Sequence, residues 1–269
     1  MTWPYDTYLV DHTHKVVYAP IHKVASISLT NWFLKHLVKH PDQVPVLQLN
    51  DVARKNYSLL NENDVQEVLA NYFKFAFVRH PFSRLVSGYL FWFVRVPRDT
   101  PDNPYYLVHI KRMITEIYQS YGMTPNFEKG ITFRQFVEFL YRIQCIEFVL
   151  RTNPKPEIKN LLDPHFCPQH RILQGVNFDL ICQLEKIEEG IAAIRESISA
   201  DIPNPLHSNK TKTDPGVITN NCWDQYSSEL QKMDIPPSYE AFLNTDIIIV
   251  AVKIYYEDFV LYGYEIDPR

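Results

Sequence analysis

Two short apolar runs along the chain each end at a polar loop and are followed by a pattern of helical spacing. The first run, 16–21, is rich in β-branched and aromatic residues, and helical spacing follows at 28–40. The second run, 73–78, is apolar except for Lys74, and Pro81 separates it from a strongly apolar helical segment at 82–94. Runs of this length and composition are typical of buried strands. Two strand-loop-helix units predict an α/β fold with a parallel sheet.

The rest of the pattern is mostly helical. A helical interpretation fits six further segments: 63–72, 107–121, 132–150, 186–199, 227–232 and 238–244. The segment 176–184 is a further candidate strand, and the polar, proline-containing stretches 95–106 and 152–170 are predicted to be loops. The chain closes on an apolar and aromatic segment at 245–264, and we find no internal repeat.

Composition narrows the classes of protein that this pattern allows. The chain has 269 residues, of which 46% are hydrophobic and 22% are charged. That is enough apolar material for one sizeable core, and we favour a single domain over residues 1–269. The formal net charge is −4 and the basic residues are scattered, so the broad cationic surface of a nucleic-acid binder is not expected.

Cysteine usage and the first residues bear on the compartment. Without CxxC spacing, reduced thiols are expected, a disulfide is not implied, and a zinc site is poorly supported. The four cysteines are Cys145, Cys167, Cys182 and Cys222. Residues 1–15 carry charge and a proline where a signal peptide needs an apolar run, and no stretch reaches the length of a membrane span. We therefore expect a soluble, cytoplasmic protein, with the Golgi lumen as the alternative only if an N-terminal anchor has been removed.

The first polar loop, 22–28, is a candidate phosphate site. It lies between a predicted strand and a predicted helix N-terminus, where backbone N–H groups and the helix dipole favour an anion. Lys23 adds a positive charge, and Ser26 and Ser28 add hydroxyl donors. The alternative is that the serines cap the helix and Lys23 is solvated. No GxxxxGK[ST] pattern occurs, which disfavours an ordinary P-loop that cleaves ATP or GTP.

The second loop and its helix place an arginine at the end of a strand and a serine two turns into the helix. Arg79 can form a bidentate bond to a phosphate, with Ser87 donating from the helix. The alternative is that Arg79 and Arg84 are surface ions and that Ser87 is a small packing residue. Taken alone, this loop favours the alternative.

Together the two loops resemble the membrane-bound carbohydrate sulfotransferases and their soluble bacterial relatives. This group, sulfotransferase family 2, includes the chondroitin, HNK-1 and heparan 2-O-sulfotransferases. In the family a PKxASxS segment holds the 5′-phosphosulfate of the donor, and a later RxPxxRxxSxY segment holds its 3′-phosphate. The matching residues are Lys23, Ala25, Ser26 and Ser28 in the first pattern and Arg79, Pro81, Arg84, Ser87 and Tyr89 in the second. Similar family segments correspond to 131–140, 164–173, 178–187 and 254–264, so the resemblance spans most of the chain.

The resemblance implies the sulfotransferase fold, a P-loop-containing α/β architecture with a central parallel sheet flanked by helices. It implies 3′-phosphoadenosine 5′-phosphosulfate (PAPS) as the sulfuryl donor, and no metal is expected. The donor-binding residues that it implies are Lys23, Val24, Ala25, Ser26, Ile27, Ser28, Arg79 and Ser87. Two positions depart from the family pattern. His22 replaces the usual proline, and Ile27 replaces the usual threonine, which removes one hydroxyl from the 5′-phosphate pocket.

The expected chemistry assigns two catalytic residues. Sulfuryl transfer is an in-line displacement in which charge builds on the bridging oxygen of the leaving phosphate, and Lys23 is the expected stabiliser. The acceptor hydroxyl must lose its proton, a role that suits a neutral histidine. We predict His165 as this base, because the resemblance brings its segment to the acceptor side. His22, His80 and His170 are rivals, since each lies beside a matched motif.

The sequence thus predicts a PAPS-dependent sulfotransferase that acts on a hydroxyl of a carbohydrate or of a small natural product. Two alternatives stay open. One is a non-catalytic nucleotide- or glycan-binding domain of the same fold, for which the changes at His22 and Ile27 speak. The other is a small-molecule kinase, against which the missing Walker A glycines count. Lys210, Lys212 and Glu185 stay outside the predicted site, and the sequence names neither the acceptor nor the oligomeric state.

Overall fold

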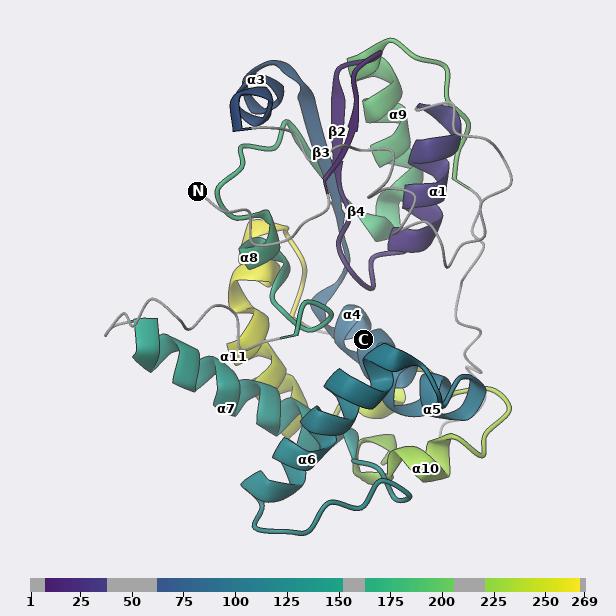
Figure 1. Cartoon of the computed structure of the whole chain (residues 1–269), viewed down its shortest axis with the longest axis vertical. Coiled ribbons are helices and arrows are strands. Elements are labelled where there is room, and N and C mark those ends of the chain that lie inside the picture. Colours follow the sequence, from purple (N-terminus) through teal and green to yellow (C-terminus); the bar gives the residue numbers. More distant parts are fainter. Residues whose placement is uncertain (1–7, 38–61, 152–162, 206–220, 267–269) are drawn as a thin grey trace. The chain divides into compact units, whose positions relative to one another are not determined.

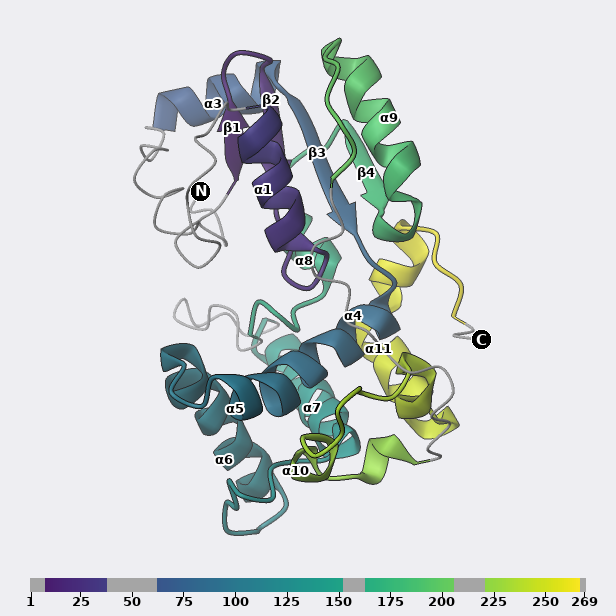
Figure 2. The same ribbon diagram turned by 90° about the vertical axis from the view of Figure 1, so that its right-hand side faces the viewer.

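The computed structural model describes residues 8–37, 62–151, 163–205 and 221–266, and its chain forms two compact units (Figures 1 and 2). One unit comprises Met1–His80 and Gln169–Lys210, and we call it the sheet unit. The other comprises Pro81–Pro168 and Thr211–Arg269, and we call it the helical unit. The two are described separately, and the single domain expected from composition stays a prediction.

The sheet unit is built on four strands in the order β1-β2-β3-β4. The strands are β1 (Leu9–Asp11), β2 (Val16–Ala19), β3 (Phe73–Val78) and β4 (Leu180–Gln183). Strands β2, β3 and β4 are parallel, and β1 adds an antiparallel edge beside β2. This confirms the predicted α/β class and the parallel sheet. The strand predicted at 73–78 has the predicted bounds, the candidate at 176–184 is shorter than expected, and β1 was not predicted.

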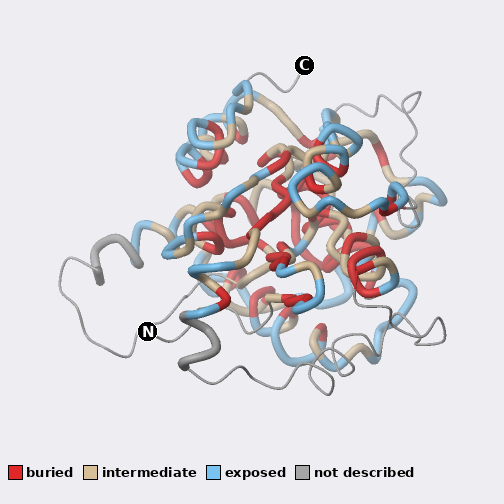
Figure 3. The backbone as a smooth tube through the Cα atoms, turned by 90° about the horizontal axis from the view of Figure 1, so that it is seen from above, coloured by how far each residue is buried: buried red, intermediate tan, exposed pale blue. Residues whose placement is uncertain are grey.

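Helices cover both faces of this sheet. The unit contains α1 (Ser26–His36), α3 (Glu62–Asn71), α8 (Gln169–Leu173), the 3₁₀ turn η4 (Leu184–Lys186) and α9 (Ile187–Ile198). Figures 1 and 2 show α1 and α9 on one face and α3 on the other. Strands β1 and β2 are buried along their whole length, and β3 is buried except at its first residue (Figure 3). Such continuous burial explains why β2 is an unbroken apolar run and why β3 is apolar except at Lys74, which is buried in an ion pair with Asp179.

Aromatic side chains join α1 to the sheet. Phe33 of α1 packs against Tyr18 and Phe75, whose ring centroids lie 5.8 and 6.2 Å from its own. Tyr18 and Phe75 are paired in register on neighbouring strands and stack at 5.1 Å. Because side chains alternate along a strand, Val17 points to the opposite face, where it clusters with Val68 of α3.

Helix α9 approaches the sheet closely at Gly190. A Cβ added there would lie 2.9 Å from the Cys182 sulfur and 2.9 Å from the ring of Phe77. Real Cβ contacts do not reach this distance, so the close packing of α9 on β3 and β4 requires glycine at this position.

The helical unit begins with a nearly continuous helix. Its first elements are α4 (Pro81–Tyr89), the π-helical segment η2 (Leu90–Arg95) and α5 (Val96–Asp99). The loop predicted at 95–106 is therefore largely wrong, because helix continues to Asp99. Pro97 is the second residue of α5, which directly follows η2, where the Val96 N–H bonds to the carbonyl of Phe91.

The remaining elements of the helical unit follow the predicted order. They are η3 (Tyr106–Ile110), α6 (Lys111–Ser120), α7 (Phe133–Arg151), η5 (Cys222–Asp224), α10 (Ser227–Leu230), η6 (Tyr239–Phe242) and α11 (Thr245–Leu261). Tyr89 lies at the centre of an aromatic core with Phe93, Phe133, Phe136 and Phe242. Within the described segments, no helix has the length and apolar character needed to cross a membrane. Cys145, Cys167, Cys182 and Cys222, all among the described residues, form no disulfide with one another.

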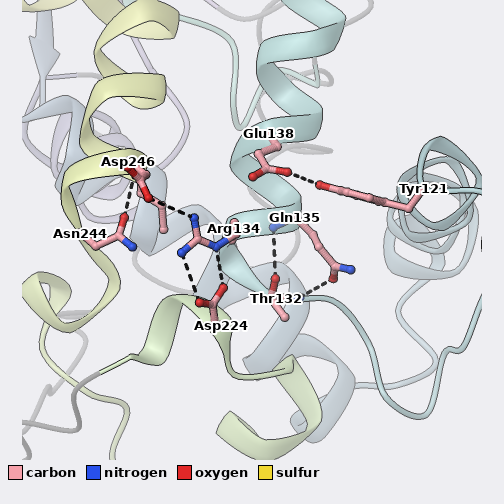
Figure 4. A network of polar contacts seen from close by, with 9 residues as sticks. Tyr121, Thr132, Arg134, Gln135, Glu138, Asp224, Asn244 and Asp246 are labelled. Carbon is pink, nitrogen blue, oxygen red and sulfur yellow. Dashed lines mark hydrogen bonds and ion pairs between the residues drawn. The ribbon is translucent and has the colours of Figure 1, made fainter.

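A polar network on α7 links it to neighbouring elements (Figure 4). Arg134 makes a bidentate contact with Asp224, at 2.7 and 3.2 Å, and lies 3.9 Å from Asp246 at the start of α11. One turn further along α7, Glu138 accepts a hydrogen bond from the hydroxyl of Tyr121. The network joins α7 to η5, α11 and the end of α6 through side chains alone.

Candidate functional site

The loop between β2 and α1 is bent by two residues in the left-handed backbone region. Lys23 has φ +66° and Ala25 has φ +46°, although neither is glycine. Val24 between them is buried and donates its N–H to the carbonyl of Ile21 at 3.3 Å. Left-handed residues other than glycine are strained and collect at functional sites, where the surrounding structure holds them. The core contact of Val24 thus fixes a strained loop that presents Lys23.

Helix α1 begins at this loop without a side-chain cap. Its N-cap residue is Ala25, which makes no side-chain cap hydrogen bond, and the first turn holds no acidic residue. Ser26, Ile27 and Ser28 form that first turn, and neither serine is the N-cap residue. A left-handed residue followed by helical residues makes a concave set of N–H groups that suits an anion, and the dipole of this 11-residue helix adds to it. Ile27 is 45% exposed at the position where the family has a hydroxyl.

Arg79 lies against this loop within the sheet unit. Its Nη1 donates to the carbonyl oxygen of Lys23 at 3.1 Å. Two motifs that are 56 residues apart in the chain are thereby brought together. The contact orients the guanidinium beside the uncapped start of α1, so positive charge and helix N–H groups lie in one region. Binding of a phosphate there stays a prediction.

The backbone of Arg79 is held by a buried glutamine. The Gln169 amide accepts from the Arg79 N–H at 2.8 Å and donates to the Arg79 carbonyl at 2.8 Å. Gln169 has no exposed surface. The next N–H, that of His80, donates to Glu185 Oε1 at 2.9 Å. Side chains from α8 and η4 thus continue the hydrogen bonding beyond the end of β3, and this fixes the point from which the Arg79 side chain starts.

The other residues of the arginine-serine motif belong to the helical unit. Arg84 is buried and donates to the carbonyls of Cys167 and Pro164 at 2.8 and 3.3 Å, so the expectation that it is a surface ion is wrong. Tyr89 is buried and donates to the carbonyl of Ile131 at 2.8 Å. Ser87 is 9% exposed in α4. Arg84 and Tyr89 therefore stabilise the fold, and the predicted role of Ser87 is untested.

His165 is paired with a carboxylate that sequence reasoning missed. Its Nδ1 lies 2.7 Å from Asp163 Oδ1, and its backbone N–H donates to the same oxygen at 2.9 Å. Burial alone would raise the pKa of Asp163, but hydrogen bonds from His165 and Tyr105 outweigh it and hold that pKa below its ordinary value. A charged carboxylate has no proton to donate, so the proton in this contact is on Nδ1. In the neutral form of His165 this leaves the lone pair on Nε2, the atom that a general base uses.

Two of the supporting residues had a signal in the sequence. Gln169 lies inside the segment 164–173 that resembles the family, and Asp163 stands two positions before the predicted base. Their partners were not visible, because the bonds of Gln169 span 90 residues. Lys210 and Lys212 lie outside the described residues.

Comparison with known proteins agrees with the motifs. The family model described as "Sulfotransferase family" matches residues 6–265. Carbohydrate sulfotransferase 11 of Mus musculus is 25% identical over 228 residues, which cover 78% of this chain and 58% of that protein. Carbohydrate sulfotransferase 10 of Gallus gallus is 24% identical over 278 residues, which cover 97% of this chain and 67% of that protein.

The chain thus spans 58% to 67% of the length of these two relatives. Both relatives are vertebrate proteins, and nothing supports the expectation of a bacterial-type member. No solved structure gives a significant match.

Proposed function

The chain belongs to the sulfotransferase family, and from this premise we propose that it transfers a sulfuryl group from PAPS to a hydroxyl of a carbohydrate. The names of the two relatives support a carbohydrate acceptor, and a small natural product stays the alternative. We further propose that residues 1–269 act as one sulfotransferase domain. The observation that carries the proposal is the contact between Arg79 and the Lys23 loop at an uncapped helix N-terminus.

The donor is assigned to the groups around this contact. Backbone N–H groups of residues 24–28 and the hydroxyls of Ser26 and Ser28 would bind the 5′-phosphosulfate, because they combine donors with the positive end of a helix dipole. Arg79 would bind the 3′-phosphate, with Ser87 as a second donor. Main-chain donors do not depend on the side chain, so the loss of a hydroxyl at Ile27 leaves them in place.

The transfer step needs one proton acceptor and one stabilised leaving group. As the acceptor oxygen forms its bond to sulfur, its proton passes to Nε2 of His165. The bond between sulfur and the 5′-phosphate oxygen breaks, and the electron pair stays on that phosphate. Lys23 stabilises the negative charge that builds there. The products are the sulfated acceptor, 3′-phosphoadenosine 5′-phosphate (PAP) and protonated His165.

The test separates binding from turnover. Calorimetry with PAP should show binding by the wild-type chain and a loss of about 10-fold or more in Lys23→Ala and Arg79→Ala, since each removes a charged hydrogen bond. Lys35→Ala is the matched control, because it removes the same charge from the last turn of α1. His165→Gln should bind PAP normally and lose about 10²-fold or more in turnover. Unchanged PAP affinity in both charge variants would refute the donor site.

A non-catalytic binding domain is the second candidate, and the missing hydroxyl at Ile27 favours it. Incubation with PAPS and a panel of glycans and small alcohols, followed by mass spectrometry, distinguishes the two. A sulfated acceptor together with PAP indicates a transferase. Tight PAP binding without product from any acceptor indicates the binding domain.

A further inference from the structure

The carboxylate beside His165 accepts three hydrogen bonds, all within the helical unit. Asp163 Oδ1 accepts from the ring and the backbone of His165, and Oδ2 accepts from the hydroxyl of Tyr105 at 2.5 Å. The side chains of His165 and Asp163 are only 13% and 9% exposed. Hydrogen bonds in a water-poor environment act more strongly on one another than hydrogen bonds in water. The three residues therefore form a linked chain in which each bond affects the next.

The rings around this chain leave Tyr105 little freedom to turn. Tyr105 stacks on Trp92, with ring centroids 4.8 Å apart, and on His109, with centroids 4.4 Å apart. Trp92 also meets the edge of His165 at 4.9 Å. These ring contacts hold Tyr105 in the orientation in which its hydroxyl donates to Asp163.

The backbone around the carboxylate is also fixed. The carbonyl of Asp163 accepts the N–H groups of Phe166 and Cys167 at 2.8 and 2.9 Å. Arg84 donates to the carbonyls of Pro164 and Cys167, and Tyr255 donates to that of Phe166 at 2.7 Å. Among the described residues, the titratable and charged groups that contact His165, its loop or Tyr105 include Asp163, Tyr105, His109, Arg84 and Tyr255. Of these, the negatively charged Asp163 is hydrogen-bonded to the imidazole, and Tyr105 donates a hydrogen bond to the same carboxylate.

We propose that Tyr105 and Asp163 are positioning residues that set the tautomer and the proton affinity of His165. Asp163 holds the proton on Nδ1 and stabilises the imidazolium that forms when Nε2 accepts a proton. Tyr105 acts in the opposite direction, because its hydroxyl withdraws part of the carboxylate charge from the imidazole. The two effects together set the pKa of His165: Asp163 makes Nε2 a better proton acceptor, and Tyr105 limits the fraction of His165 that is already protonated before the reaction. This inference rests on the proposed function only where it concerns turnover.

Opposite changes in the pKa of His165 distinguish this role from a merely structural one. Asp163→Asn removes the negative charge and should lower that pKa, so the acidic limb of the kcat/KM profile moves to lower pH. Tyr105→Phe keeps the stacked ring but leaves the full carboxylate charge on His165, so the limb moves to higher pH. We expect turnover to fall about 10²-fold or more in Asp163→Asn and only several-fold in Tyr105→Phe, with unchanged PAP affinity.

Tyr121→Phe is the matched control. Tyr121 also donates to a carboxylate, that of Glu138, in the same unit, and it is part of the separate network in Figure 4. This variant removes an equivalent hydroxyl and should leave the pH profile unchanged. A shift as large as that of Tyr105→Phe would show that the profile reports stability rather than His165.

Histidine NMR keeps this inference separate from the proposed function. The imidazole of His165 is titrated in labelled protein without donor or acceptor, and its signal is assigned by its loss in His165→Gln. A lower pKa in Asp163→Asn and a higher one in Tyr105→Phe support the positioning role even if His165→Gln retains full activity, which would refute only the base. Shifts in the same direction, or no shift in either variant, overturn the inference.

Discussion

The candidate residues of the sheet unit and those of the helical unit are held by different kinds of contact. Around Lys23 and Arg79 the main chain is the principal partner: Arg79 donates to a carbonyl, and Gln169 binds the Arg79 backbone on both sides. Around His165 side chains are the partners, with a carboxylate on the imidazole and a tyrosine on the carboxylate. The first region fixes where groups lie, and the second also fixes how strongly one group binds a proton.

The difference matches what each region is proposed to do. An anion is recognised by N–H groups and fixed positive charges, whose protonation does not change near neutral pH. A general base must change its protonation in every cycle, so its neighbours have to control a pKa. The comparison teaches that substitutions near Arg79 should change affinity and substitutions near His165 should change pH dependence.

The two arginines of one motif give the largest expected contrast. Arg84→Met should lower the free energy of unfolding by about 3 kcal/mol, because two buried carbonyls lose a charged donor. Arg79→Met should change stability by less than about 1 kcal/mol, since Arg79 is only half-buried, and should weaken PAP binding at least as much as Arg79→Ala. Urea unfolding and calorimetry measure the two quantities. Equal losses of stability would contradict the separation of structural and binding arginines.

Gln169 tests whether the sheet-unit region depends on main-chain support. Gln169→Leu leaves the N–H and the carbonyl of Arg79 without these bonds and should lower the free energy of unfolding by about 2 kcal/mol. PAP affinity should fall as well, because the Arg79 side chain loses its fixed starting point. Gln174→Leu is the matched control, since Gln174 is exposed just beyond α8. A loss of stability with unchanged PAP affinity would show that the two hydrogen bonds from Gln169 to the Arg79 backbone have no part in binding.

Local patterns predicted the longer strands but neither the edge strand β1 nor every helix. Residues 73–78 were assigned correctly because a strand buried on both faces is largely apolar, here with Lys74 as the exception. Strand β1 was missed because three residues at a sheet edge, one of them Asp11, give no pattern. The loop prediction at 95–106 failed because its prolines were taken as helix breakers, whereas Pro97 lies where the helical backbone of η2 continues into α5.

The candidate site was predictable only in part, because a local sequence pattern contains residue types but not the contacts between distant residues. Lys23, Arg79 and His165 could be proposed from residue type and motif, because charge and basicity belong to a side chain, and their roles stay predictions. Gln169 was missed because its role exists only through bonds to a residue 90 positions away. Asp163 is close in sequence to His165, but the proposed role of its carboxylate depends on its burial and on its hydrogen bond from Tyr105. Neither can be read from the local sequence.

A smaller difference between the regions should appear in acid. Burial opposes ionisation of Asp179 and Asp163, yet hydrogen bonds hold the pKa of each below its ordinary value: Lys74 bonds to Asp179, and His165 and Tyr105 bond to Asp163. A lowered folded-state pKa contributes stability at neutral pH, and this is lost as pH falls through that pKa, below about 4.

Asp163 should show the stronger effect, because the Asp179 side chain is 45% exposed whereas that of Asp163 is 9% exposed. Thermal melting of the wild-type chain, Asp163→Asn and Asp179→Asn at pH 3 to 7 measures how much of the acid dependence of stability each carboxylate contributes. Added salt should reduce only the contribution of Asp179. Equal acid dependence in the two variants would remove this part of the contrast.

The smallest expected effects concern the strained N-cap of α1. Ala25 has a left-handed backbone, which glycine adopts without strain and β-branched residues do not. Ala25→Gly should therefore change stability by less than about 0.5 kcal/mol, because relief of strain offsets the greater freedom of the unfolded chain. Ala25→Val should lower stability by about 1 kcal/mol. PAP affinity should be unchanged in the glycine variant, since every main-chain N–H is retained. A tenfold loss of affinity there would mean that the Ala25 methyl group, and not the main chain, shapes the anion site.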